Sequence, residues 1–541
     1  MQKERLPSFW PIRNSCGGKN DMRYEISAVF RRSVTIELLN EEIFKPPKPV
    51  TVELDGRECM KAETNVFSIY GLLPDREYTL TIDGESKTFT TKPESFLLDV
   101  REFGAVGDGV KEDTPFLQAA ILSCPKDGTV YIPAGKYRSG PLFLKSHMTL
   151  CLEKGAELLG LTDRKKYPIL TGMTSSTDES QEVNFGSWEG NPLSMFGSLI
   201  TAIDCEDIDI IGEGTINGCA ENGDWWENPK EKEGAWRPNL VYFCRCSNIR
   251  MQGLTLTMSP SWTLHPYYSN HLAFYNLKIK NPYQSPNTDG FDPESCEDVL
   301  VLGTDISVGD DCIAIKSGKL YMAKNHLKRT KKIEIRNCLL ENGHGAVTVG
   351  SEIAGGVIDV HVSRCIFQGT DRGVRIKSRR GRGKESLLDG LYFENIRMDQ
   401  VHMPLTVNMF YCCDPDGHSE YVQSLEEFPV DDGTPVIGRI CLSNIDCKDV
   451  HGSLVTAYGL PEQKIACIEV KGMRASFAPA SERQPEQAIM ADHVPYMNGR
   501  SFVLHNIERV RLLDITVEGC DDKAPEMVGV MEKEIENLRY L

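Results

Sequence analysis

Four short polar segments between residues 287 and 377 carry the side chains best suited to chemistry. Two of them hold three carboxylates, the third holds a histidine between two glycines, and the fourth holds two cations. Carboxylates that lie close together raise one another's pKa, and proteins use such groups as general acids near neutral pH. Cations beside them would bind an anionic substrate, because arginine grips a carboxylate through two hydrogen bonds. The four segments are Asn287-Thr288-Asp289-Gly290, Gly309-Asp310-Asp311, Gly343-His344-Gly345 and Arg375-Ile376-Lys377.

The spacing of these segments predicts that they are stacked. They follow one another at intervals of roughly 20–35 residues, the length of one repeat in many solenoid proteins. Residues one turn apart in stacked parallel strands lie ~4.8 Å from each other. Any one segment alone would be read as a turn or a solvated corner. Four of them in order, one in each repeat, favour a single column of catalytic side chains.

Asp310 and Asp311 are neighbours in the sequence, which constrains the backbone at this point. On a flat strand their side chains would point to opposite faces. Both could reach one substrate only if the chain bends or bulges there, and Gly309 permits such a bend.

The elements that would position the column are short β-strands in a repeat. Alternating apolar runs, each followed by a turn and a second run, recur with almost no helical pattern between them. This periodicity predicts an all-β fold, a right-handed parallel β-helix over residues 96–541. Leucine-rich repeats would need a different leucine and asparagine pattern, and propeller blades would be longer. The runs start at Ile208, Ile249, Leu272, Val299, Ile333, Val360 and Leu391, with weaker copies near Ile440, Ile468 and Val510.

The N-terminal part has a different pattern. Residues 1–21 are polar and are predicted to be an extension, and residues 22–95 show short alternating runs separated by turns, which predicts a small β-sandwich. The segment from Tyr70 to Leu80 resembles a strand-connecting corner of fibronectin type III domains, with Tyr78 as the corner tyrosine. A short amphipathic helix follows Asp113, a plausible N-cap, and would cover the end of the solenoid.

Composition excludes some classes of function. The chain has 541 residues and a formal net charge of −18, which argues against a nucleic-acid partner bound through the overall field. No apolar stretch is long enough to predict a membrane span, and the first residues lack a secretion signal, so we expect a cytoplasmic protein without a membrane partner. The alternative is a secreted or periplasmic protein whose signal has been removed. The 18 cysteines are scattered without zinc-type pairs, as in a reducing compartment.

The four segments together resemble those of glycoside hydrolase family 28, the polygalacturonases, and the resemblance covers roughly residues 98–520. It implies a right-handed parallel β-helix that hydrolyses α-1,4-linked galacturonate with inversion. It also implies that Asp310 is the general acid and that Asp289 and Asp311 activate the water. His344 would maintain the protonation of the acid. Inversion ordinarily needs carboxyl groups ~6.5–9.5 Å apart.

The same resemblance implies the substrate-binding residues. Arg375 and Lys377 would bind the carboxylate of the sugar, Asn287 would contact the sugar, and Tyr411 would stack on it. Trp262 and His265 lie about one repeat before Asp289 and are predicted to line a subsite. A buried core position is the competing interpretation for each aromatic residue.

The mode of cleavage is predicted from two departures from the family pattern. Gly309 stands where endo-acting members commonly carry glutamine and exo-acting relatives often carry glycine. The N-terminal domain and two polar insertions, residues 173–190 and 415–434, could close one end of the cleft. Both features favour an exo-acting enzyme.

Several alternatives stay open at this point. Rhamnogalacturonan or xylogalacturonan could be the substrate, and a pectate lyase would share the β-helix but would require calcium. A non-catalytic pectin-binding protein would leave the three carboxylates unexplained. We expect a pectic oligosaccharide or polysaccharide as the partner and no metal or other cofactor. The sequence indicates no oligomeric state.

Overall fold

The computed structural model describes residues 23–174, 182–487 and 490–541; the predicted extension, residues 1–21, lies outside them. The N-terminal strands form two antiparallel sheets around their own apolar core. Within it, the Tyr78 hydroxyl accepts a hydrogen bond from the Leu73 N–H at 2.8 Å, the contact that a corner tyrosine makes. The two sheets are β1 Arg23–Val29, β2 Ser33–Leu39 and β5 Val66–Tyr70, and β4 Arg57–Ala62, β3 Val50–Leu54, β6 Glu77–Ile82 and β7 Glu85–Thr90.

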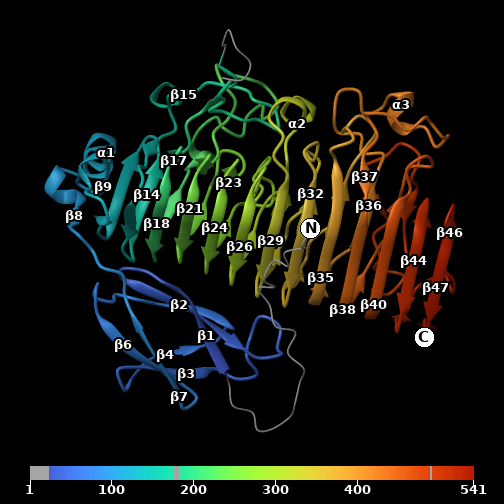
Figure 1. The fold of residues 1–541 in the computed structure, drawn as a ribbon, viewed down its shortest axis with the longest axis horizontal. Helices are drawn as coiled ribbons and strands as arrows, with labels where there is room; N and C mark the ends of the chain where they lie inside the picture. Colours follow the sequence, from blue (N-terminus) through green and yellow to red (C-terminus); the bar gives the residue numbers. More distant parts are fainter. Residues whose placement is uncertain (1–22, 175–181, 488–489) are drawn as a thin grey trace, which may run out of the picture.

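The rest of the chain is a solenoid of parallel strands, as predicted (Figure 1). Its strands stack in three columns, of which the first and second belong to one large sheet. The first column is β8 Leu97–Asp99, β10 Gly128–Ile132, β13 Met148–Leu152, β18 Glu206–Gly212, β21 Ser247–Gln252, β24 Asn270–Tyr275, β26 Glu297–Leu302, β29 Thr330–Arg336, β32 Val357–Ser363, β35 Leu387–Asp399, β38 Arg439–Val450, β40 Ile465–Phe477, β44 Ile507–Leu513 and β47 Glu532–Glu536.

The second column runs beside the first, and the third forms separate sheets. The second is β9 Asp108–Glu112, β11 Gly135–Ser139, β14 Ala156–Gly160, β19 Thr215–Asn217, β22 Thr255–Thr257, β25 Lys278–Lys280, β27 Asp305–Ser307, β30 Leu339–Glu341, β33 Ile366–Gln368, β45 Thr516–Glu518 and β48 Arg539–Tyr540, with β35, β38 and β40 continuing into it. The third is β12 Leu142–Phe143, β17 Ile200–Ile203, β20 Val241–Cys244, β23 Leu264–Tyr267, β28 Ile313–Ile315, β31 Val347–Val349, β34 Arg372–Lys377, β36 Met403–Asn408, β39 Ser453–Tyr458, β43 Arg500–His505 and β46 Glu526–Val528.

The predicted repeat is the register of the first column. The apolar residue that starts each run pairs with the start of the next run, so the ten residues form one stacked row inside the solenoid. The row is Ile208, Ile249, Leu272, Val299, Ile333, Val360, Leu391, Ile440, Ile468 and Val510.

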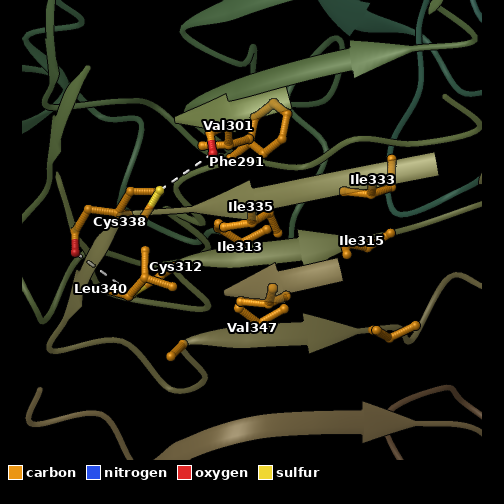
Figure 2. Packing of buried hydrophobic residues seen from close by; sticks show 14 of the residues in the cluster. Phe291, Val301, Cys312, Ile313, Ile315, Ile333, Ile335, Cys338, Leu340 and Val347 are labelled. Carbon is orange, nitrogen blue, oxygen red and sulfur yellow. Dashed lines mark hydrogen bonds between the residues drawn. The ribbon is translucent and has the colours of Figure 1, made fainter. Parts of the chain in front are cut away.

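The solenoid core is made by strands of different columns that face each other. Figure 2 shows Ile335 of β29 beside Ile313 of β28 and Ile333 beside Ile315, with Cys338 to one side of them. The Cys338 thiol donates a weak hydrogen bond to the Val301 carbonyl oxygen at 3.7 Å. Every cysteine within the described ranges is a free thiol. The buried ones therefore serve as small apolar side chains.

Helix α1 Thr114–Ser123 covers the N-terminal end of the solenoid with Leu117, Ala120 and Ile121. Asp113 occupies the N-cap position, but its side chain makes no capping hydrogen bond to the helix. The carboxylate accepts hydrogen bonds from the Val106 and Gly107 N–H groups instead. It therefore holds the preceding loop rather than the helix end.

The sandwich packs on the outer face of the first column, below the sheet in Figure 1. Phe30 meets Tyr275 of β24 edge to face, and the buried Glu37 carboxylate accepts hydrogen bonds from Arg336 and Arg364. The loops that carry α2 and α3 lie on the opposite side (Figure 1). The prediction that the N-terminal domain closes the cleft is therefore wrong, because the domain covers another face.

The remaining elements lie between the strands of the three columns, and one of them, β37 Val436–Ile437, pairs with β35 in the large sheet. None of the helices within the described ranges is long and apolar enough to cross a membrane. These elements are η1 Val100–Phe103, η2 Arg164–Lys166, η4 Ala220–Asn222, α2 Leu320–Asn325, α3 Glu420–Gln423, β15 Ile169–Leu170, β16 Met195–Phe196, β37 Val436–Ile437, β41 Glu486–Gln487 and β42 Tyr496–Met497.

Candidate active site

The three predicted carboxylates lie together just before strand β28 of the third column. Asp310 and Asp311 lie in a bend between β27 and β28, so the flat-strand conflict does not arise. The preceding turn of the solenoid brings Asp289 beside them, where the Gly290 N–H donates to the Asp311 carbonyl oxygen. One side-chain oxygen from each of the three lies within 4.8 Å of the others. Asp289 and Asp311 are buried, and Asp310 is partly exposed.

Two cations of β34 hold the Asp311 carboxylate. Lys377 Nζ lies 2.6 Å from Asp311 Oδ2, and Arg375 Nη1 lies 3.2 Å from Oδ1. Both side chains point to this face because residues two apart on a strand share a side, while Val374 and Ile376 enter the core. Burial raises the pKa of Asp311, but Lys377 and Arg375 outweigh it and hold that pKa below its usual range. Asp311 is therefore ionised.

The surroundings of Asp289 shift its pKa in the opposite direction from that of Asp311. Burial, followed by repulsion from Asp310, raises the pKa of Asp289 to about 7. Repulsion between carboxylates this close disfavours the ionised form of Asp289. The site therefore combines an ionised carboxylate, Asp311, with a pair, Asp289 and Asp310, in which Asp289 ionises only near neutral pH.

Sequence reasoning missed a buried lysine under this pair. Lys316 Nζ lies 3.7 Å from Asp289 Oδ2, 3.4 Å from Asp292 Oδ1 and 3.2 Å from Glu352 Oε2. It also lies 4.1 Å from the centre of the Trp262 ring. Its charge lowers the pKa of Asp289 against burial and Asp310. The available signal was a lysine directly after the apolar run Ile313–Ile315, in the same repeat as Asp310 and Asp311.

His344 contacts a carboxylate that was also missed. Its Nδ1 lies 2.7 Å from Asp371 Oδ2. This hydrogen bond, with the nearby charge of Asp310, raises the pKa of His344 against partial burial. Only glycine fits at position 345, because a Cβ on Gly345 would lie 2.7 Å from Asp311 Oδ1. The Gly-His-Gly segment can thus pass directly over the carboxylates.

The basic run that follows is not a free positive surface. The chain carries seven cations between Arg372 and Lys384, and each forms an ion pair with a carboxylate, so the charge of this run is largely neutralised. Arg375 and Lys377 share the Asp311 carboxylate, and Arg379 and Arg382 both contact Asp414. The pairs are Arg372–Asp371, Arg375–Asp311, Lys377–Asp311, Arg379–Asp416, Arg380–Glu462, Arg382–Asp414 and Lys384–Asp432.

Two of the predicted sugar-binding residues lie beside these groups. Tyr411 is nearly buried, and the Lys377 ammonium lies 5.6 Å from the centre of its ring. Asn287 accepts a hydrogen bond from Arg237 Nη2 at 2.7 Å, which orients its amide. Trp262, in contrast, is largely covered and contacts Lys316. It therefore packs against the buried lysine of the site and is not open to a sugar.

His265 does not line the cleft. Its side chain is fully buried, with Nε2 3.0 Å from Glu294 Oε2 and Nδ1 3.0 Å from Asn239 Oδ1. A sugar could not touch it, so the predicted binding role is wrong for this residue. The competing interpretation, a hydrogen-bonded core histidine, is the one observed, because the neighbouring strands supply both partners.

The two polar insertions form a barrier beside the site. The Lys319 N–H donates to the Gly190 carbonyl oxygen at 2.9 Å, and its ammonium lies 3.0 Å from the Asp414 carboxylate. Lys319 thus ties residues 182–190 to the loop that precedes α3. Residues 175–181 of the first insertion lie outside the described ranges.

Comparison with known proteins identifies relatives among polygalacturonases. A probable polygalacturonase of Vitis vinifera is 32% identical over 325 residues, which cover 59% of this chain and 64% of the relative. The match therefore spans less than two thirds of that relative's length. An exopolygalacturonase of Zea mays is 26% identical, over 65% of this chain and 81% of the relative.

A solved structure gives the same fold. The family 28 exopolygalacturonase of Yersinia enterocolitica superposes with a TM-score of 0.69 at 19% identity, over 94% of this chain and 98% of that one. The predicted right-handed parallel β-helix is thereby confirmed.

The relatives also correct the predicted location. They are plant and bacterial enzymes that degrade pectin outside the cell. The comparison points to secretion, so the prediction of a cytoplasmic protein is wrong.

Family models cover most of the solenoid. A model described as rhamnogalacturonase A/epimerase, pectate lyase-like matches residues 97–183. The model of the glycosyl hydrolases family 28 matches residues 145–425, a range that includes all of the predicted site residues. The chain belongs to glycosyl hydrolases family 28.

Proposed function

We propose that this chain hydrolyses α-1,4-galacturonosyl linkages of pectic chains, with inversion, from chain ends. One observation carries the proposal: three carboxylates lie within 4.8 Å of one another while one of them is held ionised by Arg375 and Lys377. Such a site offers an acid, a base and a binding place for a carboxylate within one sugar's reach.

Asp310 is the general acid of the proposal, because it is the one carboxyl of the three with solvent exposure on the side of His344. Its proton passes to the glycosidic oxygen as the bond to the anomeric carbon breaks. A water molecule, oriented by Asp311, attacks that carbon from the other side and gives its proton to Asp289. The His344 imidazolium then returns a proton to Asp310, and Asp289 releases its proton to solvent.

The argument for inversion depends on what can reach the carboxylates and not on the distance between them. The carboxyl oxygens lie closer than the ~6.5–9.5 Å of ordinary inverting pairs and nearer the ~5–5.5 Å of retaining ones. A retaining enzyme, however, needs a carboxylate oxygen that bonds the anomeric carbon. Asp289 and Asp311 are 4% and 1% exposed, so a water reaches them more easily than a sugar ring. This burial supports inversion.

The two cations that contact Asp311 support an acidic sugar as substrate. Two cations face one carboxylate there, and a galacturonate carboxylate would supply the second anion. Arg375 offers two parallel hydrogen bonds and Lys377 a point charge. The Tyr411 ring is buried beside Lys377 and supports that cation from the protein side.

Three observations support the exo mode of cleavage. The barrier tied by Lys319 lies beside the site, and the Zea mays relative is described as an exopolygalacturonase. A Cβ on Gly309 would lie 2.4 Å from the Ser285 carbonyl oxygen and 2.6 Å from that of Pro282. The glutamine of endo-acting members therefore has no room here.

A timed product profile on polygalacturonate, digalacturonate and rhamnogalacturonan tests the proposal. We expect short products from the first minutes on polygalacturonate, without intermediate oligomers and without the ultraviolet absorbance of a lyase product. Early intermediate oligomers would contradict the exo mode. Rhamnogalacturonan as the better substrate, xylogalacturonan as the better substrate in a parallel assay, or affinity for pectin without turnover would replace the proposed function. NMR of the first anomer formed decides between inversion and retention.

A further inference from the structure

Three different metal-binding side chains converge beside Tyr411, away from the three carboxylates. Cys412, His418 and Asp492 each place one donor atom within 4.8 Å of the other two. His418 Nδ1 lies 2.8 Å from Asp492 Oδ1. The His418 side chain is 68% exposed and that of Asp492 is 35% exposed. An ion from solution can therefore reach the cluster directly.

A buried glutamine sets the position of two of these residues. Gln423 of α3 is 3% exposed. Its Nε2 donates to the Gly417 and Phe410 carbonyl oxygens, both at 2.7 Å. Its Oε1 accepts a hydrogen bond from the Asp492 N–H at 2.9 Å. The backbone next to His418 and the backbone of Asp492 are thus held by one side chain.

The third residue is held from the opposite side. The Cys412 N–H donates to the Met490 carbonyl oxygen at 3.0 Å. Gly417 lies so close that a Cβ there would come within 2.2 Å of the Cys412 carbonyl oxygen. This close approach folds the chain back and sets His418 over Cys412. All three backbones are therefore in place without an ion.

We propose that Cys412, His418 and Asp492 form a zinc site. Thiolate, imidazole and carboxylate together are a donor set that zinc takes in tetrahedral sites, with a fourth position for water. Bond lengths of about 2.0–2.3 Å place such donors about 3.3–3.7 Å apart. The His418–Asp492 pair would open slightly from 2.8 Å to admit the ion, and the Cys412 sulfur already lies within 4.8 Å of both donor atoms. Binding releases the thiol proton of Cys412, and the hydrogen bond between His418 and Asp492 is replaced by two bonds to the metal.

The site would join the two segments that border the proposed sugar-binding cations. Cys412 directly follows Tyr411 in the chain. On the other segment, the Met490 carbonyl oxygen accepts a hydrogen bond from Asn408 Nδ2, and the Met490 sulfur lies 3.8 Å from Arg375 Nη2. The metal would therefore stiffen the wall of the cleft next to Arg375 without touching the substrate.

Cobalt binding tests the site without any substrate. The full chain, freed of metal with a chelator, is titrated with Co²⁺, whose bond to a thiolate gives a charge-transfer absorbance. We expect one equivalent to bind with that absorbance and zinc to displace it. Cys412→Ser should abolish the absorbance, and His418→Ala or Asp492→Ala should weaken binding by tenfold or more. Cys413→Ser, which changes the adjacent exposed thiol, is the control and should bind normally.

The same samples give outcomes that overturn the proposal. They are binding without the thiolate absorbance, absorbance that survives Cys412→Ser, or absorbance lost only in Cys413→Ser. Zinc should also raise the melting temperature of the unmodified chain and leave that of Cys412→Ser unchanged; an equal rise in both would count against the site. Because neither readout uses turnover, failure here is distinct from failure of the proposed hydrolysis.

Discussion

Lys377 Nζ lies 2.6 Å from Asp311 Oδ2. A residue predicted to bind the substrate is therefore also the ion-pair partner of a proposed catalytic carboxylate. Arg375 approaches the other oxygen of the same group at 3.2 Å. The two roles are coupled, since the cation that attracts the sugar carboxylate also keeps Asp311 ionised.

Lys377→Ala should therefore weaken binding and also change the pH profile. We expect KM for oligogalacturonates to rise roughly 10- to 100-fold, as for loss of a charged hydrogen bond. The pKa of Asp311 should rise, so activity should begin to fall at a higher pH on the acidic side. Lys384→Ala is the matched control, because Lys384 pairs with the exposed Asp432. Equal effects in both variants would refute the coupling.

Asp310→Asn should remove the proton donor. Loss of a general acid lowers turnover by about 10²–10⁴-fold, and we expect kcat to fall by at least that factor while KM changes little. Circular dichroism should show the same strand content as the unchanged chain. Near-normal turnover in a folded variant would remove Asp310 from the mechanism.

Lys316→Gln should shift the acidic limb of the pH profile. That limb reports ionisation of Asp289, the proposed base, and the pKa of Asp289 is about 7. Lys316 favours the ionised form, so its removal raises that pKa and moves the limb to higher pH, by about one to three units at 3.7 Å. An effect on stability alone, with an unmoved limb, would show that Lys316 is only structural.

Asp371→Asn should make activity depend on the titration of His344. The hydrogen bond that His344 donates to Asp371 raises the pKa of His344, so without it the imidazolium is lost at a lower pH. We expect kcat to fall more at about pH 7.5 than at about pH 5.5, where the imidazole is still protonated. A loss that is the same at both pH values would contradict a proton-donating role for His344.

Glu37→Ala should destabilise the protein without changing catalysis. Glu37 is 1% exposed and accepts hydrogen bonds from Arg336 and Arg364 at 2.8 and 2.6 Å. Removing it takes a shared carboxylate away from two partly buried arginines, while Arg336 keeps its contact with Glu334, so we expect a cost of about 1.5–3 kcal/mol. Urea unfolding measures this, with the exposed Glu41→Ala as control. Because the sandwich lies away from the site, kcat should be unchanged; a changed kcat would link the two.

Much of the fold followed from the sequence because a solenoid is a local repeat. Each apolar run pairs with the next one along the chain, so the spacing of Ile249, Leu272 and Val299 was enough to align their strands. The order of the polar segments placed Asp289, Asp310 and His344 in one column for the same reason. In such a fold, neighbours in sequence repeats are neighbours in space.

The contacts between side chains from different turns and loops were decided only by the tertiary structure. Which cation pairs with Asp311, which histidine is exposed and which lysine lies under Asp289 depend on burial and on loops of irregular length. The same holds for the sandwich, whose strands predicted a domain but not the face it covers. The repeat thus determined the column of chemical groups, and the packing around it determined their charge states, because burial and close partners set each pKa.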